Sequence, residues 1–254
     1  MKALLITLLV GLFILVGAIL GNILKNNKKF IDISIGLALG VMILLLILDI
    51  IPEAYELLSD SIEYKWLAIV ALIISGIVGF VGLKLLDSFV PHHEHEALHH
   101  HEHKNDKCHN EHLEHVGILA SIAVIIHNII EGMTLYVTTT QDFKSGILLC
   151  IAIGLHNIPL GIIISTTLQS KKEIIINSIV LSLSTFVGGL IVFLVNDMVS
   201  NCLVGILLSI TLGMISYIII LELLPQIIYN KNKKYNIFGI VLGILIIIIS
   251  TLLG

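Results

Sequence analysis

Eight long apolar stretches constrain this sequence more than any other feature. They run near 3–24, 33–58, 66–88, 116–138, 145–168, 174–196, 202–228 and 235–253. Each covers the roughly 20 residues that a helix needs to cross the hydrocarbon core of a bilayer. Lipid offers a backbone no hydrogen-bond partners, so segments of this length must satisfy their own polar groups as helices. We therefore expect an all-α, polytopic membrane protein with eight transmembrane helices.

The composition supports a membrane protein and narrows its partners. The chain is 57% hydrophobic and 13% charged, whereas about a quarter of a soluble domain is charged. All 14 basic residues are lysines, so the arginine that reads nucleic acids is missing. No phosphate-binding G-x-x-x-x-G-K-[ST] run is present, which argues against ATP binding by a P-loop. We expect the lipid bilayer as a partner, with no nucleic acid and no resident cofactor.

The lysines predict the orientation of the chain. Eleven of the fourteen lie in or beside the odd-numbered loops between spans, and Lys2, Lys65 and Lys144 lie at the other side. Cytoplasmic loops carry the excess of basic residues in membrane proteins. We therefore expect the odd loops inside and both termini outside. The small size and the Ile/Lys/Asn-rich composition favour the cytoplasmic membrane of a bacterium. The oligomeric state stays open, a homodimer included.

Ionisable side chains in lipid are costly and usually functional. The fourth and fifth spans each contain a His-Asn pair near mid-length, followed by a glycine four residues after the Asn. The pairs are His127-Asn128 and His156-Asn157. A short connection near 139–144 makes these two helices antiparallel neighbours. Polar side chains at equal depth in neighbouring helices can point at one another, so we expect them to meet at the bilayer midplane.

The spacing of these residues is typical of a metal site. His127 and Glu131 are one helical turn apart on one face. Imidazole nitrogen and carboxylate oxygen suit Zn²⁺, Fe²⁺, Mn²⁺ or Co²⁺. Pro159 removes a backbone donor and leaves the carbonyl of Leu155 without its helical partner. The alternative is a buried polar network that only holds helices together.

A second repeat connects the two halves of the chain. Asp49-Ile50-Ile51-Pro52-Glu53 in span two matches Glu222-Leu223-Leu224-Pro225-Gln226 in span seven. By the lysine count the first lies toward the outer face and the second toward the inner face. This placement predicts an inverted repeat with a midplane site, as transporters often have. Asp49 and Glu53 would attract ions outside and Glu222 would help release them inside. The alternative is two proline-terminated helices with capping acids.

The domain organisation follows from these patterns. We expect a 3+2+3 arrangement: spans one to three over 1–88, spans four and five with the metal site over 116–168, and spans six to eight over 169–254. Residues 89–115 form a loop that is rich in metal-binding side chains and has little apolar surface to bury, so we expect disorder there. On the lysine count this loop is cytoplasmic. Its candidate ligands are His92, His93, His95, His99, His100, His101, His103, Cys108, His109, His112 and His115. A dispensable linker is the alternative for this loop.

These motifs resemble those of the ZIP (Zrt/Irt-like) metal-ion transporters. HNIIEG at 127–132 and HNIPLG at 156–161 carry the resemblance, supported by DIIPEA at 49–54 and ELLPQ at 222–226. The resemblance covers nearly the whole chain. It implies a metal path built mainly from spans four and five, with His127, Asn128, Glu131, His156 and Asn157 at ligand positions. It also implies a rocking or elevator-like motion of the central helices.

Two departures from the family pattern affect the expected site. Related members often carry a glutamate where this chain has Leu160, and some carry another near Thr185. Without these carboxylates we expect one bound ion rather than two, with His127, Glu131 and His156 as direct ligands and Asn128 and Asn157 as weaker oxygen donors.

We therefore expect transport of divalent transition metals into the cytoplasm, zinc foremost, with Fe²⁺, Mn²⁺, Co²⁺ or Cd²⁺ as other substrates. The sequence does not fix import against export. Two further classes remain: an intramembrane metal-dependent hydrolase with Glu131 as base, and a metal sensor without flux. None of the eight apolar spans contains the H-E-x-x-H pattern of zinc proteases, so we do not expect an enzyme.

Overall fold

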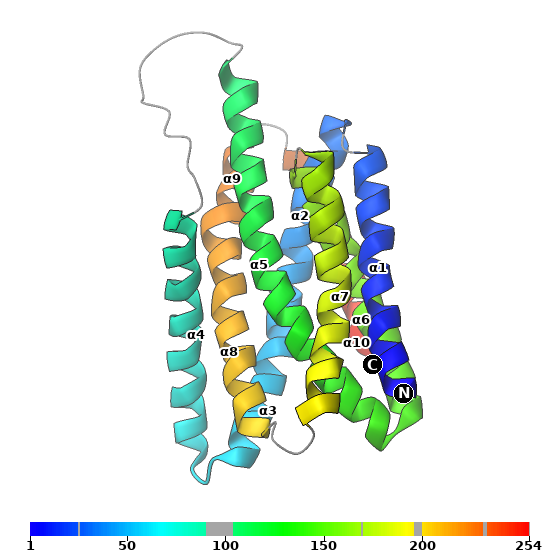
Figure 1. Cartoon of the computed structure of the whole chain (residues 1–254). Coiled ribbons are helices and arrows are strands. Elements are labelled where there is room, and N and C mark those ends of the chain that lie inside the picture. Colours follow the sequence, from blue (N-terminus) through cyan, green and yellow to red (C-terminus); the bar gives the residue numbers. More distant parts are fainter. Residues whose placement is uncertain (25, 90–103, 169, 196–199, 231–232, 254) are drawn as a thin grey trace.

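The computed structural model is a bundle of long helices (Figure 1) and describes residues 1–24, 26–89, 104–168, 170–195, 200–230 and 233–253. Its elements are α1 (Lys2–Leu24), α2 (Lys28–Leu45), η1 (Leu46–Ile50), α3 (Ile51–Ser61), α4 (Lys65–Phe89), α5 (Lys104–Gln141), α6 (Phe143–Thr167), α7 (Lys171–Val195), α8 (Asn201–Tyr217), η3 (Ile218–Leu223), α9 (Leu224–Tyr229) and α10 (Lys233–Leu253). No strand occurs among these described residues, so the all-α fold class is confirmed.

Eight helical spans in the described part of the chain are long and apolar enough to cross a membrane. Most coincide with single helices, but span two continues through α2, η1 and α3, and span seven through α8, η3 and α9. Each span predicted from hydropathy matches one of them. Both termini lie at the same end of the bundle, opposite the end at which α5 begins (Figure 1).

The helices pack as two groups. The first helix group comprises α1, α5, α6 and α7, in which α1 packs against α6 and α7, and α5 against α6 and α7. The second helix group comprises α2, η1, α3, α4, α8, η3, α9 and α10, in which α2 packs against α10 and α4 against α8. The groups meet mainly where α6 contacts α2 and α10 and where α5 contacts α8.

Close helix approach at glycines holds each group together. At Gly17 an added Cβ would overlap the backbone of Ile158, and at Gly161 it would overlap that of Ile14. Gly36 lies in the same way against Asn236 of α10. Small residues allow such approach in membranes, where apolar burial does not drive helices together. Throughout the described residues, every glycine this close to another helix has its neighbour in its own group, so the two groups are separate packing units.

Both proline motifs produce the same local structure. The five-residue π-helix η1 precedes Pro52, and the π-helix η3 precedes Pro225. The N–H of Ile51 binds the carbonyl of Leu46, and the N–H of Leu224 binds that of Ile219. Proline lacks an N–H and its ring crowds the preceding turn, which a wider turn relieves. Each helix continues past its proline as α3 or α9, so the proline does not end the span.

This likeness is what an inverted repeat would produce. Exchanging spans one and six, two and seven, three and eight, and four and five also maps each main packing pair onto another: α1–α6 onto α7–α5, and α2–α10 onto α8–α4. The 3+2+3 arrangement itself stays a prediction.

The loop predicted over 89–115 overlaps the first part of α5, which begins at Lys104. Residues 90–103 lie outside the described residues, so the expected disorder stays untested. The same holds for the loop's candidate ligands from His92 to His103. Helix α5 includes the four remaining candidate ligands, Cys108, His109, His112 and His115. The positions of their side chains are outside what the structure describes.

Replacing Gly17 with alanine should destabilise the protein, because the new Cβ would overlap the backbone of Ile158. Overpacking costs about 1–3 kcal/mol, which corresponds to a loss of several degrees in Tm for a chain of this length. Gly82→Ala is the control, since nothing lies within 4 Å of a Cβ added there. Thermal unfolding of the two purified variants checks this. Equal losses of Tm would contradict the packing described for α1 and α6.

Candidate metal centre

A tight connection brings α5 and α6 side by side. Asp142 caps α6, and its carboxylate accepts hydrogen bonds from the backbone N–H groups of Lys144 and Ser145 and from the Ser145 hydroxyl. The bonds from Ser145 hold the pKa of the Asp142 carboxyl below its ordinary value. Gly146 lies directly against Thr139 at the end of α5. The last turn of α5 therefore lies against the first turn of α6, and the two helices run antiparallel, as the short loop predicted.

Three side chains meet deep within this pair. Nε2 of His156 donates a hydrogen bond to Oε1 of Glu131 at 2.9 Å. Nε2 of His127 lies 3.7 Å from the same oxygen, one helical turn away on α5. All three residues are buried, with 2% of His127, 8% of Glu131 and 4% of His156 exposed. One carboxylate therefore lies between two imidazoles, away from bulk water.

The donor set of these three residues fits a transition-metal ion. One ligand atom from each lies within 4.8 Å of the other two. A tetrahedral zinc ion with ligands at about 2.0–2.1 Å keeps neighbouring ligand atoms about 3.3 Å apart, so Glu131 and His156 need to separate by only a few tenths of an ångström. Both ring nitrogens of His127 and Oε2 of Glu131 are buried without a hydrogen-bond partner. Buried polar atoms are rarely left unpaired, and such groups call for an explanation. A bound ion supplies one.

The two asparagines flank this cluster in the chain and are fully buried. Nδ2 of Asn128 donates to the carbonyl of Leu181 on α7 at 3.4 Å, while its Oδ1 has no partner. Neither amide atom of Asn157 has a partner. Oxygens without partners are consistent with the predicted role of these residues as helping donors, which stays a prediction.

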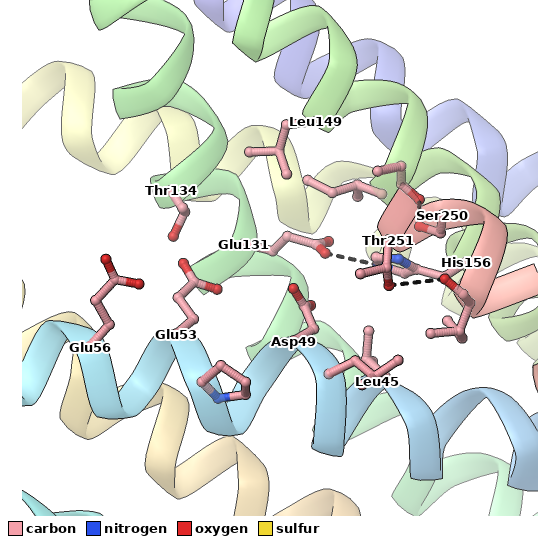
Figure 2. Close-up of a pocket in the computed structure, with 15 residues that line it drawn as sticks. Leu45, Asp49, Glu53, Glu56, Glu131, Thr134, Leu149, His156, Ser250 and Thr251 are labelled. Atoms are coloured by element: carbon pink, nitrogen blue, oxygen red, sulfur yellow. Dashed lines mark hydrogen bonds and ion pairs between the residues drawn. The ribbon is translucent and has the colours of Figure 1, made fainter. Parts of the chain in front are cut away.

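A cavity of about 320 Å³ leads to the cluster. It is lined by Glu131 and His156 at one end and by Asp49 and Glu53 of the second helix group (Figure 2). His127 is not among its lining residues. The carboxyl of Asp49 points toward Glu131 and His156 in Figure 2. Asp49 and Glu53, which the sequence predicted on the metal path, therefore face the same cavity as Glu131 and His156.

Sequence reasoning missed four polar residues of this cavity: Glu56, Thr134, Ser250 and Thr251. Glu56 is the most exposed of the three acids on this face, and its spacing of three residues from Glu53 would have revealed it. Thr134 follows Glu131 by three residues on α5. Ser250 and Thr251 come from α10, whose sequence carries no motif, so only the tertiary structure brings them to the site.

Glu222 lies apart from this cavity. It is buried in η3 with 6% of its surface exposed, and its Oε2 has no hydrogen-bond partner. Nearby, the hydroxyl of Tyr217 donates to the carboxylate of Asp87 at 2.6 Å. The structure thus does not bring Glu222 together with the other predicted path residues, and its proposed role in release stays a prediction.

The positions that carry glutamates in related proteins are apolar or neutral here. Leu160 is part of the main hydrophobic core, with 2% exposed. Thr185 is fully buried on α7, where its backbone contacts Gly132, the residue after Glu131. Neither side chain has a carboxyl group, so neither position offers a second carboxylate beside Glu131.

Comparisons with known proteins show the family to which this chain belongs. The family model described as ZIP zinc transporter matches residues 87–251. A zinc transporter ZupT from Streptococcus mutans is 30% identical over 99% of this chain and 97% of its own length. ZupT proteins from Clostridium perfringens and Chlorobium chlorochromatii are also 30% identical, each over 96% of its own length. The eight spans, the paired His-Asn motifs and these matches together show that the chain belongs to the ZIP family of metal-ion transporters.

Proposed function

We propose that the protein carries Zn²⁺ across the cell membrane into the cytoplasm through the site formed by His127, Glu131 and His156. The observation that supports this most is the burial of two imidazoles and one carboxylate, with unpaired polar atoms, at mid-length of two neighbouring spans. Isolated ionisable groups there would be costly. Relatives with 30% identity over the full chain are named zinc transporters.

The acidic cavity is the proposed route from outside. Glu56, Glu53 and Asp49 follow one another along α3 and η1 toward Glu131 (Figure 2). Carboxylates in a low-dielectric cleft concentrate cations and speed their capture. The lysine distribution favours a position outside the cell for this end of the bundle. An ion would therefore pass along a row of oxygen donors before it reaches the imidazoles.

One ion at a time is the proposed stoichiometry. Glu131 is the only carboxylate in the buried three-residue cluster found among the described residues, and Leu160 and Thr185 supply none. The two asparagines would complete the coordination through oxygen. With a single negative charge the site would hold its ion less tightly than a doubly anionic site and release it more readily.

Transport is proposed to require motion between the two helix groups. Contacts at glycines join the helices within each group and not across the boundary. The three ligands all belong to the first helix group, whereas Asp49, Glu53 and Glu56 belong to the second. The first helix group would thus carry the ion relative to the second. Two positive charges moving inward gain about 4–5 kcal/mol per 100 mV of membrane potential, which suffices to drive uptake.

Replacing Glu131 with glutamine should abolish zinc uptake into proteoliposomes, because it removes the only charged ligand of the cluster. Glu63→Gln, which changes an exposed acid between α3 and α4, is the matched control and should leave uptake intact. Uptake of Zn²⁺, Fe²⁺, Mn²⁺ and Cd²⁺ measured side by side gives the preferred ion. Normal uptake by the Glu131 variant would show that the proposed site is wrong. Folded wild-type protein that moves no ion in either direction would instead support the hydrolase or sensor classes.

Replacing the loop residues His92, His93, His95, His99, His100, His101 and His103 with serine should leave uptake measurable, because the proposed midplane site does not include them. If the loop collects or senses ions on the cytoplasmic side, the variant should respond differently to zinc trapped inside the vesicles. Initial rates at several internal zinc concentrations check both points. Complete loss of uptake would contradict an accessory role for this loop.

A further inference from the structure

The hydrogen bonds identified among the described residues can be sorted by whether they cross the boundary between the two helix groups. Interhelical hydrogen bonds such as Tyr217 to Asp87 and Asn236 to Asp32 join helices of the second helix group. The bond from Asn128 to Leu181 joins helices of the first. Two contacts at the cavity differ from these because they cross the boundary. Glu53 faces Thr134, and the hydroxyl of Ser250 donates to the carbonyl of Ala152 at 2.6 Å.

Ser250 is placed to connect the boundary to the metal centre. It lies on α10 in the cavity wall with 4% of its surface exposed. Its acceptor, Ala152, lies on α6 one turn before His156 and also lines the cavity. A shift of α6 along α10 would separate these two atoms. The buried hydroxyl would then need another partner, and a carbonyl of its own helix one turn earlier is the nearest kind available.

We propose that Ser250 is a positioning residue that holds α6 against α10 while the acidic cavity is open, and that its hydrogen bond breaks each time the first helix group moves. The inference rests on the motion between groups proposed above. It adds a specific contact that influences the relative populations of the cavity-open arrangement and of the arrangement reached after the first helix group has moved. Glu53 is less suitable for testing this point, because it also lies on the proposed ion path.

The neighbouring residue provides a matched control. Thr251 lies on the same helix and lines the same cavity, but its hydroxyl donates to the carbonyl of Ile247 in its own helix at 3.0 Å. Thr251→Val therefore removes a hydroxyl from the cavity without changing a contact between groups. Ser250→Ala removes the crossing bond, and Ser250→Thr keeps a hydroxyl at the same position.

The experiment measures the two arrangements directly in lipid vesicles. Spin labels are attached to cysteines placed at Asp60 and Thr140, which are exposed at the same end of the bundle, the first on α3 of the second helix group and the second on α5 of the first. The natural Cys108, Cys150 and Cys202 are replaced by serine. Pulsed electron paramagnetic resonance then gives the distances between the two labels and the fraction of molecules that show each distance.

We expect Ser250→Ala to lower the share of the cavity-open distance about threefold relative to the other. That ratio corresponds to about 0.6 kcal/mol, the average for a hydrogen bond between membrane helices. Ser250→Thr should restore the original ratio and Thr251→Val should not change it. If both distances occur and their populations have the same ratio in Ser250→Ala as in the parent protein, the role of Ser250 is overturned and the motion between groups stands. A single distance in the parent protein, with zinc uptake intact, would overturn the motion between groups and this inference with it.

Discussion

The placement of one carboxylate between two imidazoles inside a membrane is the interaction on which the rest of this structure depends. Glu131 contacts His156 at 2.9 Å and approaches His127 at 3.7 Å. In hydrocarbon each of these groups alone would be expensive to bury. Together they form a site whose remaining unpaired atoms can be satisfied by a cation. The tight turn at Asp142 and the closeness of α5 and α6 bring these side chains together, and the cavity lined by Asp49 and Glu53 reaches Glu131 and His156.

The second constraint is the way helices pack without a hydrophobic driving force. Glycines let α1 approach α6 and let α2 approach α10 so closely that a methyl group would not fit. These contacts join the helices within each group, and none of them crosses the boundary between the groups in the part of the chain that the structure describes. The three proposed metal ligands lie on one side of that boundary, and Asp49, Glu53 and Glu56 lie on the other. A division of this kind suits a protein that must move a bound ion relative to a fixed frame.

Much of the fold could be predicted from sequence, because membrane helices are recognisable by their length and hydropathy. Part of the candidate site could be predicted as well. The His-Asn pairs of α5 and α6 are local motifs at equal depth, so their meeting followed from a short loop. Ser250 and Thr251 could not be found in this way, since their importance comes from the packing of α10 against α6. The grouping of α1 with α5, α6 and α7 could not be predicted either. Contacts between distant spans depend on small residues, and the sequence does not show which helix each of them faces. The π-helices before Pro52 and Pro225 were likewise invisible in the pattern, although the repeated motif pointed to a shared local structure.

The measurement that tests the central claim most directly is anomalous X-ray diffraction at the zinc absorption edge from crystals of the protein grown with zinc. It locates each zinc ion in the chain regardless of what the histidine-rich loop binds. Our account predicts one ion at the midplane, in contact with Nε2 of His127, Nε2 of His156 and the carboxylate of Glu131. Two ions at the midplane would contradict the single-ion site. Fully occupied zinc elsewhere in the chain, with none between these three residues, would contradict the site itself.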